Sequence, residues 1–192
     1  MNNSEYIQLI KNEFGLDAKD VICAYKFAKH KHRGQYRDDG SPYIIHPVRV
    51  AELTRENKPS TNAKILYISA LLHDTLEDTY TSYKEICNRF DSQVASLVME
   101  LSTAKEVPHT LKGGKAEYLS KKMENMTNYA LFIKLCDRLD NLRDVAHTNE
   151  EKVNRLVRET KTILEYLQQH RPYTQSQQKI VDLINVELKK YH

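Results

Sequence analysis

Glycine and proline are scarce in this sequence, with five of each among 192 residues. Together they make up about 5% of the chain, against roughly 12% in average usage. Sandwiches and barrels need many turns, and turns draw heavily on these two residues. Their scarcity therefore argues against an all-β fold and favours a helical one.

Other absences narrow the class of protein. Only three cysteines occur and no CxxC pair is among them, which argues against a disulfide framework and favours a reducing compartment. No apolar run approaches the ~20 residues that cross a bilayer, and the polar segment 1–14 does not resemble a signal peptide. A net charge of +3 is too small to predict a nucleic-acid binder. We therefore expect a cytoplasmic protein that binds neither membranes nor nucleic acids.

The spacing of apolar residues predicts an all-α protein, a compact bundle of about eight to ten helices. The segment 62–74 is the most apolar and is expected to be a central core helix. We expect one domain over 1–192, with two helices between 150 and 190 packing on the rest. The amphipathic tail 179–192 either docks on the core or forms a homodimer contact, and we favour docking.

This apolar segment ends in a pair of ionisable residues, His73-Asp74. Glu77 and Asp78 come next, and if helical turns continue these side chains project to one side. Three carboxylates in five residues repel one another unless a cation lies among them. A buried charge is also costly unless it is paired or bound to a metal. The segment therefore predicts a metal site.

Two further residues are candidates to complete that site. His46 lies at a loop–helix junction, where a capping or packing role is the alternative, and Asp137 lies in the apolar segment 132–139. Asp137 has alternative partners in three nearby bases: Lys134, Arg138 and Arg143. Two imidazoles and two carboxylates with two waters suit Mn²⁺ or Fe²⁺ better than structural zinc. Mg²⁺ accepts carboxylates but matches two histidines less well.

Three segments carry a family resemblance: GSPYIIHPVRVAEL, ALLHDTLEDT and IKLCDRLDNLRD. Their order, H…HD…D, is similar to that of the HD superfamily of metal-dependent phosphohydrolases. More narrowly, they closely resemble the hydrolase domain of the RelA/SpoT family, over roughly residues 18–145. The one-domain length resembles most the small alarmone hydrolases, which include the metazoan SpoT homologue.

The resemblance implies an enzyme that removes the 3′-pyrophosphate from guanosine tetra- and pentaphosphate, giving GDP or GTP. It implies four Mn²⁺ ligands: His46, His73, Asp74 and Asp137. It also implies a catalytic acidic pair that positions and activates the attacking water: Glu77 and Asp78. Arg37 matches an arginine that lines the base pocket, and Asn141 matches an asparagine near the nucleotide.

Four more residues are candidates for binding the nucleotide. Lys112 and Lys115 lie where the family carries basic residues facing the phosphates, although a solvated surface loop is the equal alternative. Arg138 follows Asp137 and either reaches a phosphate or pairs with a carboxylate of the site. Tyr43 either stacks near the base or packs under the loop, and the second alternative is favoured.

The polar loop from His32 to Gly40 departs from the family pattern. Where relatives often have R-R-K-D-G, this chain has Tyr36-Arg37-Asp38-Asp39-Gly40, which lowers the positive charge near the expected nucleotide pocket. A related phosphohydrolase acting on the 2′-phosphate of NADPH or on ppApp is therefore an alternative. A non-catalytic nucleotide-binding module is a second alternative, disfavoured because a sensor does not need a water-activating acidic pair.

Overall fold

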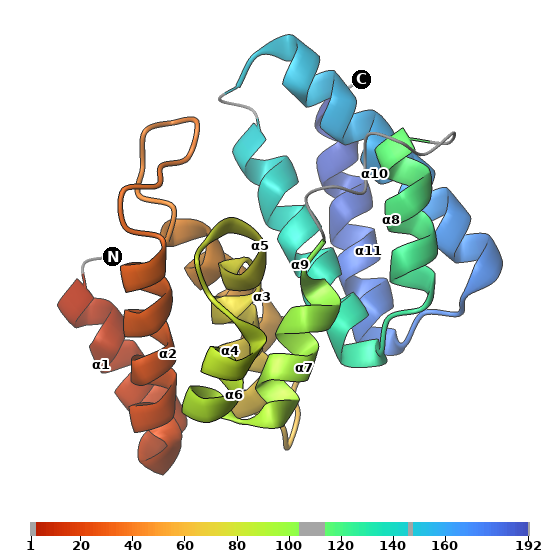
Figure 1. The fold of residues 1–192 in the computed structure, drawn as a ribbon. Coiled ribbons are helices and arrows are strands. Elements are labelled where there is room, and N and C mark those ends of the chain that lie inside the picture. The colour runs from red at the N-terminus through yellow and green to blue at the C-terminus, as the bar shows by residue number, and fades with distance from the viewer. Residues whose placement is uncertain (1–2, 104–113, 146–147, 192) are drawn as a thin grey trace. The chain divides into compact units, whose positions relative to one another are not determined.

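The computed structural model describes residues 3–103, 114–145 and 148–191, and the regular elements in these ranges are helices (Figure 1). The all-α prediction is thus confirmed. None of these helices combines the length and apolarity that a bilayer-spanning helix requires. The chain divides into two compact units, residues 1–35 with 42–102 and residues 36–41 with 103–192. The expectation of one domain stays a prediction.

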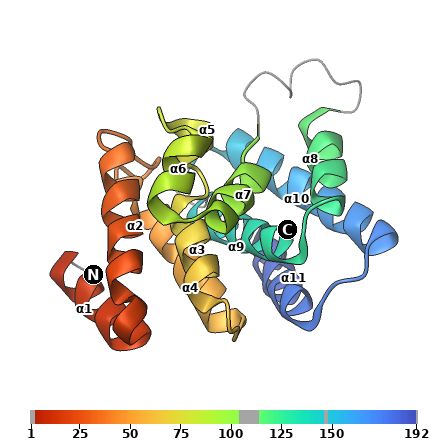
Figure 2. The same ribbon diagram turned by 60° about the horizontal axis from the view of Figure 1, so that its bottom comes forward.

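The first unit is built around α4. Its elements in chain order are α1 (Asn3–Phe14), η1 (Gly15–Asp17), α2 (Ala18–Lys31), α3 (Ile45–Asn57), α4 (Ala63–Leu72), α5 (Thr75–Asp78), α6 (Tyr83–Phe90) and α7 (Ser92–Leu101). Helices α2, α3 and α7 all pack against α4, while α1 packs on α2 and α6 on α7 (Figures 1 and 2).

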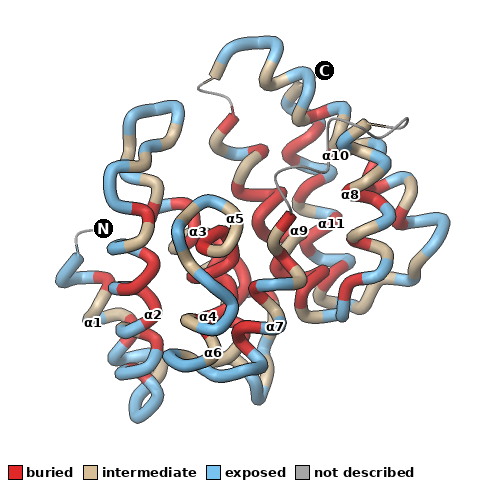
Figure 3. Tube along the Cα trace, in the orientation of Figure 1, coloured by how far each residue is buried: buried red, intermediate tan, exposed pale blue. Residues whose placement is uncertain are grey.

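Helix α4 is a core helix, as its apolar sequence predicted. Each residue from Leu66 to Leu72 is buried (Figure 3). The helix ends at Leu72, and the next two residues keep right-handed helical backbone angles. His73 and Asp74 therefore directly follow the last residue of a buried core helix.

A chain of hydroxyl groups ties three helices of this unit together. Tyr67 of α4 donates its hydroxyl hydrogen to Glu52 of α3. Because that hydrogen is used, the Tyr67 oxygen accepts from the hydroxyl of Tyr6 of α1, at 2.7 Å. Burial raises the pKa of both tyrosines well above the usual range. Both groups therefore remain protonated hydrogen-bond donors inside the core.

The second unit contains α8 (Gly114–Glu124), α9 (Asn128–Asp144), α10 (Glu150–His170), α11 (Gln175–Leu188) and η3 (Lys189–Tyr191). Helix α9 packs against α11, and α10 packs against α8 (Figures 1 and 2). The apolar face of α11, with Ile180 and Ile184, is fully buried. The hydroxyl of Tyr191 donates to the carbonyl oxygen of Leu142 at 2.7 Å, so the tail docks on α9 within this unit.

Arg171 fixes the connection between α8 and α9. Its guanidinium donates to the carbonyl oxygens of Met123 at 3.3 Å and Glu124 at 2.9 Å, and also to that of Met126. A second nitrogen donates to Oδ1 of Asn128 at 2.7 Å. The carbonyl groups that end a helix lack partners within it, so a forked cation is a suitable cap.

The tyrosine chain gives a stability prediction. Tyr67→Phe leaves the Tyr6 hydroxyl and the Glu52 carboxylate without their shared partner, and we expect the free energy of unfolding to fall by about 1–3 kcal/mol. Tyr83→Phe is the matched control, because that side chain is 39% exposed. Urea unfolding monitored by circular dichroism measures both variants. Equal stabilities would show that the buried chain contributes nothing.

Candidate metal centre

Three ionisable residues meet inside the first unit. His46 is the second residue of α3, His73 follows the last residue of α4, and Asp74 precedes α5. One ligand atom from each lies within 4.8 Å of the other two. His46 and His73 are each 1% exposed and Asp74 is 9% exposed. Since α3 and α4 pack against each other, the core itself brings these groups together.

Both imidazoles converge on one oxygen, Oδ2 of Asp74. It lies 3.0 Å from Nε2 of His73 and 3.6 Å from Nε2 of His46. Nδ1 of His73 lies 2.7 Å from the carbonyl oxygen of Ala70. A carbonyl oxygen only accepts, so Nδ1 carries a proton, and in the neutral form of the ring Nε2 presents a lone pair. That lone pair faces the carboxylate oxygen.

This arrangement fits a divalent cation. Two electron-pair donors so close repel one another unless positive charge lies between them. A proton can bridge only one imidazole and the carboxylate, whereas a metal ion can bind both ring nitrogens and the oxygen together. A backbone carbonyl on the far ring nitrogen, as at His73, is a usual partner of a metal-binding histidine. Two nitrogens and one oxygen are acceptable ligands for Mn²⁺, Fe²⁺ or Zn²⁺.

Glu77 and Asp78 lie on α5, the four-residue helix directly after Asp74. The backbone N–H of Asp78 donates to the carbonyl oxygen of Asp74 at 2.8 Å, so the helical turn expected after the His-Asp pair is present. Glu77 is half-buried and Asp78 is exposed. The fold therefore carries two further carboxylates on the turn that begins at Asp74, and their catalytic role stays a prediction.

Tyr43 contacts the carboxylates of this site. Its hydroxyl donates to Oδ2 of Asp74 at 2.7 Å and lies 3.5 Å from Oδ2 of Asp78. Its ring stacks on the imidazole of His32, with centroids 4.7 Å apart and planes at 30°. The sequence offered base stacking or packing for Tyr43 and did not indicate this hydrogen bond. Contact with a base stays a prediction.

The fourth expected ligand, Asp137, lies on α9 in the second unit and is 6% exposed. Its Oδ2 lies 2.9 Å from Nζ of Lys134, one of the three ion pairs that the sequence left open. Its Oδ1 accepts a hydrogen bond from Nδ2 of Asn141 at 2.6 Å. Membership of Asp137 in the metal centre stays a prediction.

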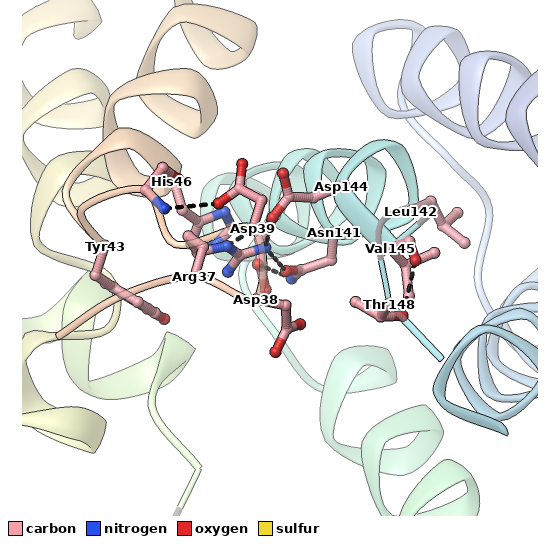
Figure 4. A network of polar contacts seen from close by, with 12 residues as sticks. Arg37, Asp38, Asp39, Tyr43, His46, Asn141, Leu142, Asp144, Val145 and Thr148 are labelled. Carbon is pink, nitrogen blue, oxygen red and sulfur yellow. Dashed lines mark hydrogen bonds and ion pairs between the residues drawn. The ribbon is translucent and has the colours of Figure 1, made fainter. Parts of the chain in front are cut away.

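Arg37 lies in the loop 36–41 of the second unit (Figure 4). Its Nε and Nη2 each lie 2.7 Å from Oδ2 of Asp144, and Nη2 also donates to Oδ1 of Asn141 at 3.0 Å. Gly40, with a φ of +82°, closes the loop and donates its N–H to the Arg37 carbonyl oxygen at 3.0 Å. Sequence reasoning missed Asp144; its spacing of three from Asn141 on one helix was the available signal.

The remaining candidates are basic. Arg138 is 7% exposed and donates to Oγ1 of Thr160 at 3.1 Å, and burial lowers the pKa of its guanidinium. Lys115 is exposed in the first turn of α8. Lys112 lies outside the described residues. Phosphate binding by these three residues stays a prediction.

Comparison with known proteins identifies the family. The family model of the HD domain matches residues 24–172. The mouse guanosine-3′,5′-bis(diphosphate) 3′-pyrophosphohydrolase MESH1 is 39% identical over 136 residues, covering 68% of this chain and 72% of that protein. The Escherichia coli bifunctional (p)ppGpp synthase/hydrolase SpoT is 36% identical over 145 residues, covering 74% of this chain and 20% of that protein. The chain therefore belongs to the HD domain family and is related to the MESH1 and SpoT hydrolases.

Some relatives are much longer than this chain. The guanosine-3′,5′-bis(diphosphate) 3′-pyrophosphohydrolase of Aquifex aeolicus is 37% identical over 172 residues, which cover 83% of this chain but only 22% of that protein. At the level of fold, a solved structure of a metazoan orthologue of SpoT that hydrolyses ppGpp superposes with a TM-score of 0.72 at 24% identity, covering 86% of this chain and 94% of that one. The Listeria monocytogenes protein lmo0812 gives a TM-score of 0.60 at 20% identity, covering 78% and 98%. Both likenesses support the fold.

A metal ion that binds only the folded chain must stabilise it. With free Mn²⁺ at 100 times its dissociation constant, we expect the free energy of unfolding to rise by about 2.7 kcal/mol. Asp74→Asn removes the shared carboxylate and should abolish this gain. Asp20→Asn is the control, because that carboxylate lies on the surface of α2 beside Lys64. Unfolding in EDTA and in Mn²⁺ measures the effect, and an undiminished gain in Asp74→Asn would contradict the site.

Proposed function

We propose that the chain is a metal-dependent 3′-pyrophosphohydrolase of guanosine tetra- and pentaphosphate, which releases pyrophosphate and leaves GDP or GTP. The observation that carries this proposal is the convergence of His46, His73 and Asp74 within 4.8 Å, in a chain of the HD domain family. The names of the MESH1 and SpoT relatives describe this hydrolysis in those proteins.

We assign four residues as ligands of one Mn²⁺ ion: His46, His73, Asp74 and Asp137. The first three are supported by their mutual distances, and Asp137 by its place in the third motif segment. These four residues would hold the ion and leave room on it for water or substrate. When bound, the ion lowers the pKa of a water molecule and neutralises charge on phosphoryl oxygens. Fe²⁺ and Mg²⁺ are the alternative ions.

The acidic pair on α5 supplies the proton acceptor. A carboxylate within hydrogen-bond reach of the attacking water can take its proton or orient it. Glu77 is half-buried whereas Asp78 is exposed, so Glu77 is the better-shielded acceptor and Asp78 the orienting group. The turn that begins at Asp74 places both residues directly after the shared ligand.

The substrate side of the proposal uses Arg37 and Asn141 for the nucleoside, with Tyr43 near the base. The edge of the Arg37 guanidinium is engaged by Asp144, so stacking on a base would use its flat face. Phosphoryl transfer also needs positive charge near the phosphates. For that role we propose three basic residues: Lys112, Lys115 and Arg138.

The loop 36–41 favours a second candidate substrate. Tyr36 is 67% exposed beside Arg37, and Asp38 forms an ion pair with Lys152. An exposed aromatic ring stacks on any base, and this loop has one basic residue, Arg37, beside Asp38 and Asp39, where the R-R-K-D-G pattern that it resembles has three. The alternative is therefore a nucleotide with adenine, either NADPH losing its 2′-phosphate or ppApp losing its pyrophosphate.

A substrate panel separates these candidates. With Mn²⁺ present we expect ppGpp to give the highest kcat/KM among ppGpp, ppApp and NADPH, measured by release of pyrophosphate or phosphate. Activity should vanish in EDTA and return with Mn²⁺. A preference for an adenine substrate would overturn the assignment of guanosine. Binding of all three nucleotides without turnover would show that the chain is a non-catalytic module.

The role of Glu77 is tested by removing its charge. Glu77→Gln should lower kcat by a factor of ~10² or more, as expected for loss of a general base, and should leave the Mn²⁺ dissociation constant unchanged. Glu56→Gln is the control, because that side chain is an exposed carboxylate of α3. Steady-state kinetics and metal titration measure both effects. Wild-type turnover in the Glu77 variant would remove it from the catalytic machinery.

A further inference from the structure

A buried histidine outside the metal centre, His32, is linked by hydrogen bonds through Gln35 to Asp78. His32 follows the last residue of α2 and is 3% exposed. Its Nδ1 lies 2.7 Å from Oε1 of Gln35, and Nε2 of Gln35 donates to the backbone carbonyl oxygen of Asp78 at 2.8 Å. Since that carbonyl only accepts, the amide nitrogen of Gln35 faces it and the amide oxygen faces His32. Nδ1 of His32 therefore carries the proton and donates it.

The same histidine supports the ring of Tyr43. The two rings are stacked, with centroids 4.7 Å apart and planes at 30°. The backbone N–H of Tyr43 also donates to the carbonyl oxygen of Gln35 at 3.0 Å. The hydroxyl at the far end of this ring donates to Oδ2 of Asp74 at 2.7 Å. Two branches of contacts thus begin at His32. The Tyr43 branch runs through the Tyr43 ring to Asp74, and the Gln35 branch runs through the Gln35 amide to Asp78.

We propose that His32, Gln35 and Tyr43 form a positioning chain that orients the Asp74 carboxylate through one branch and holds the end of α5 through the other. The proposal rests on the proposed metal centre and deepens it. The three residues act on the centre through Asp74 and Asp78 and are not themselves metal ligands. Together they connect the loop after α2 to Asp74 and to Asp78 within one compact unit.

The Tyr43 branch governs how Asp74 presents its lone pairs. A hydrogen bond to a ligating carboxylate fixes its rotation and leaves a defined lone pair for the ion. Oδ2 is also the oxygen on which both imidazoles converge. The loss of such an outer partner typically lowers metal affinity by about 10–100-fold. This branch should therefore set the metal dissociation constant.

The Gln35 branch governs α5. A four-residue helix is too short to be stable by itself, and the carbonyl groups at its end lack partners within the helix. The Gln35 amide satisfies the last of these carbonyls, that of Asp78. Because Glu77 and Asp78 make up half of this short helix, the bond should set the position of the acidic pair and hence turnover.

His32 has features of a residue kept for positioning rather than for stability. Its Nε2 is buried and has no hydrogen-bond partner among the described residues, which is an energetic cost. Burial also lowers the pKa of its imidazole, which favours the neutral ring, and the bond to Gln35 keeps a proton on Nδ1. An apolar ring at this position would avoid the unsatisfied nitrogen, and we therefore expect His32→Phe to fold.

The experiment separates the two branches with single substitutions in the full chain. Tyr43→Phe should raise the Mn²⁺ dissociation constant by about 10-fold or more and leave amide exchange of residues 74–79 unchanged. Gln35→Leu should leave the dissociation constant within about twofold of wild type, speed that exchange, and lower kcat about 10-fold. His32→Phe keeps the stacked ring and should behave like Gln35→Leu.

Two comparisons guard against a general structural effect. Gln35→Glu keeps the oxygen that accepts from His32 but loses the N–H that donates to Asp78. It should therefore reproduce the effects of Gln35→Leu. It also replaces Gln35→Leu in the test if that variant fails to fold. Because His32 and Gln35 act in one branch, the double variant should be no slower than the single ones. Tyr83→Phe, an exposed hydroxyl 3.3 Å from Ser96 Oγ, is the control.

Metal titration and amide exchange need no substrate, so they test the chain even if no tested nucleotide is hydrolysed. Unchanged Mn²⁺ affinity in Tyr43→Phe, with Mn²⁺ bound by the wild type, would overturn the first branch. Unchanged exchange at 74–79 in both Gln35 variants would overturn the second. Failure of the wild type to bind Mn²⁺ would overturn the proposed metal centre and the Tyr43 branch with it.

Discussion

One carboxylate oxygen, Oδ2 of Asp74, is the constraint on which the site depends. Nε2 of His73 lies 3.0 Å from it and Nε2 of His46 lies 3.6 Å from it, and Tyr43 donates to it at 2.7 Å. The Ala70 carbonyl holds a proton on Nδ1 of His73, so the neutral ring turns the lone pair of Nε2 toward this oxygen. Repulsion between such groups in a buried place is relieved only by positive charge. Among the described residues, the fold therefore brings together three groups that one bound cation would hold.

The core explains why that arrangement persists. Helix α4 is buried from Leu66 to Leu72 and is packed by α2, α3 and α7, so its end has little freedom to move. His73 and Asp74 are held in place as well, because they directly follow the last residue of α4. Ligand positions that cannot relax are suited to metal binding, because reorganisation would otherwise weaken the affinity. The short helix α5 packs on α7 and accepts a hydrogen bond from Gln35, in the loop after α2, at its last carbonyl oxygen.

Much of the fold and of the centre could be predicted from the sequence, for local reasons. The apolar run of α4 and the His-Asp pair at its end are adjacent in the chain, so periodicity places them together. The partner of Tyr43 could not be predicted, because its hydroxyl meets a carboxylate 31 residues away through a loop that folds back. The bond from Arg37 to Asp144 spans 107 residues, and no spacing rule reaches that far. The sequence indicates that the polar loop beginning at His32 is unusual. The contacts of His32 with Gln35 and Tyr43 depend on backbone turns that composition does not specify.

If the centre is built as we propose, both imidazoles bind one ion together with Asp74. Pulsed electron paramagnetic resonance of Mn²⁺ bound to the chain, with and without ¹⁵N-labelled histidine, measures this directly. We expect couplings to two imidazole nitrogens in the wild type and to one in His73→Ala. Stoichiometrically bound Mn²⁺ that shows no coupling to histidine nitrogen, or the same coupling in both proteins, would contradict it.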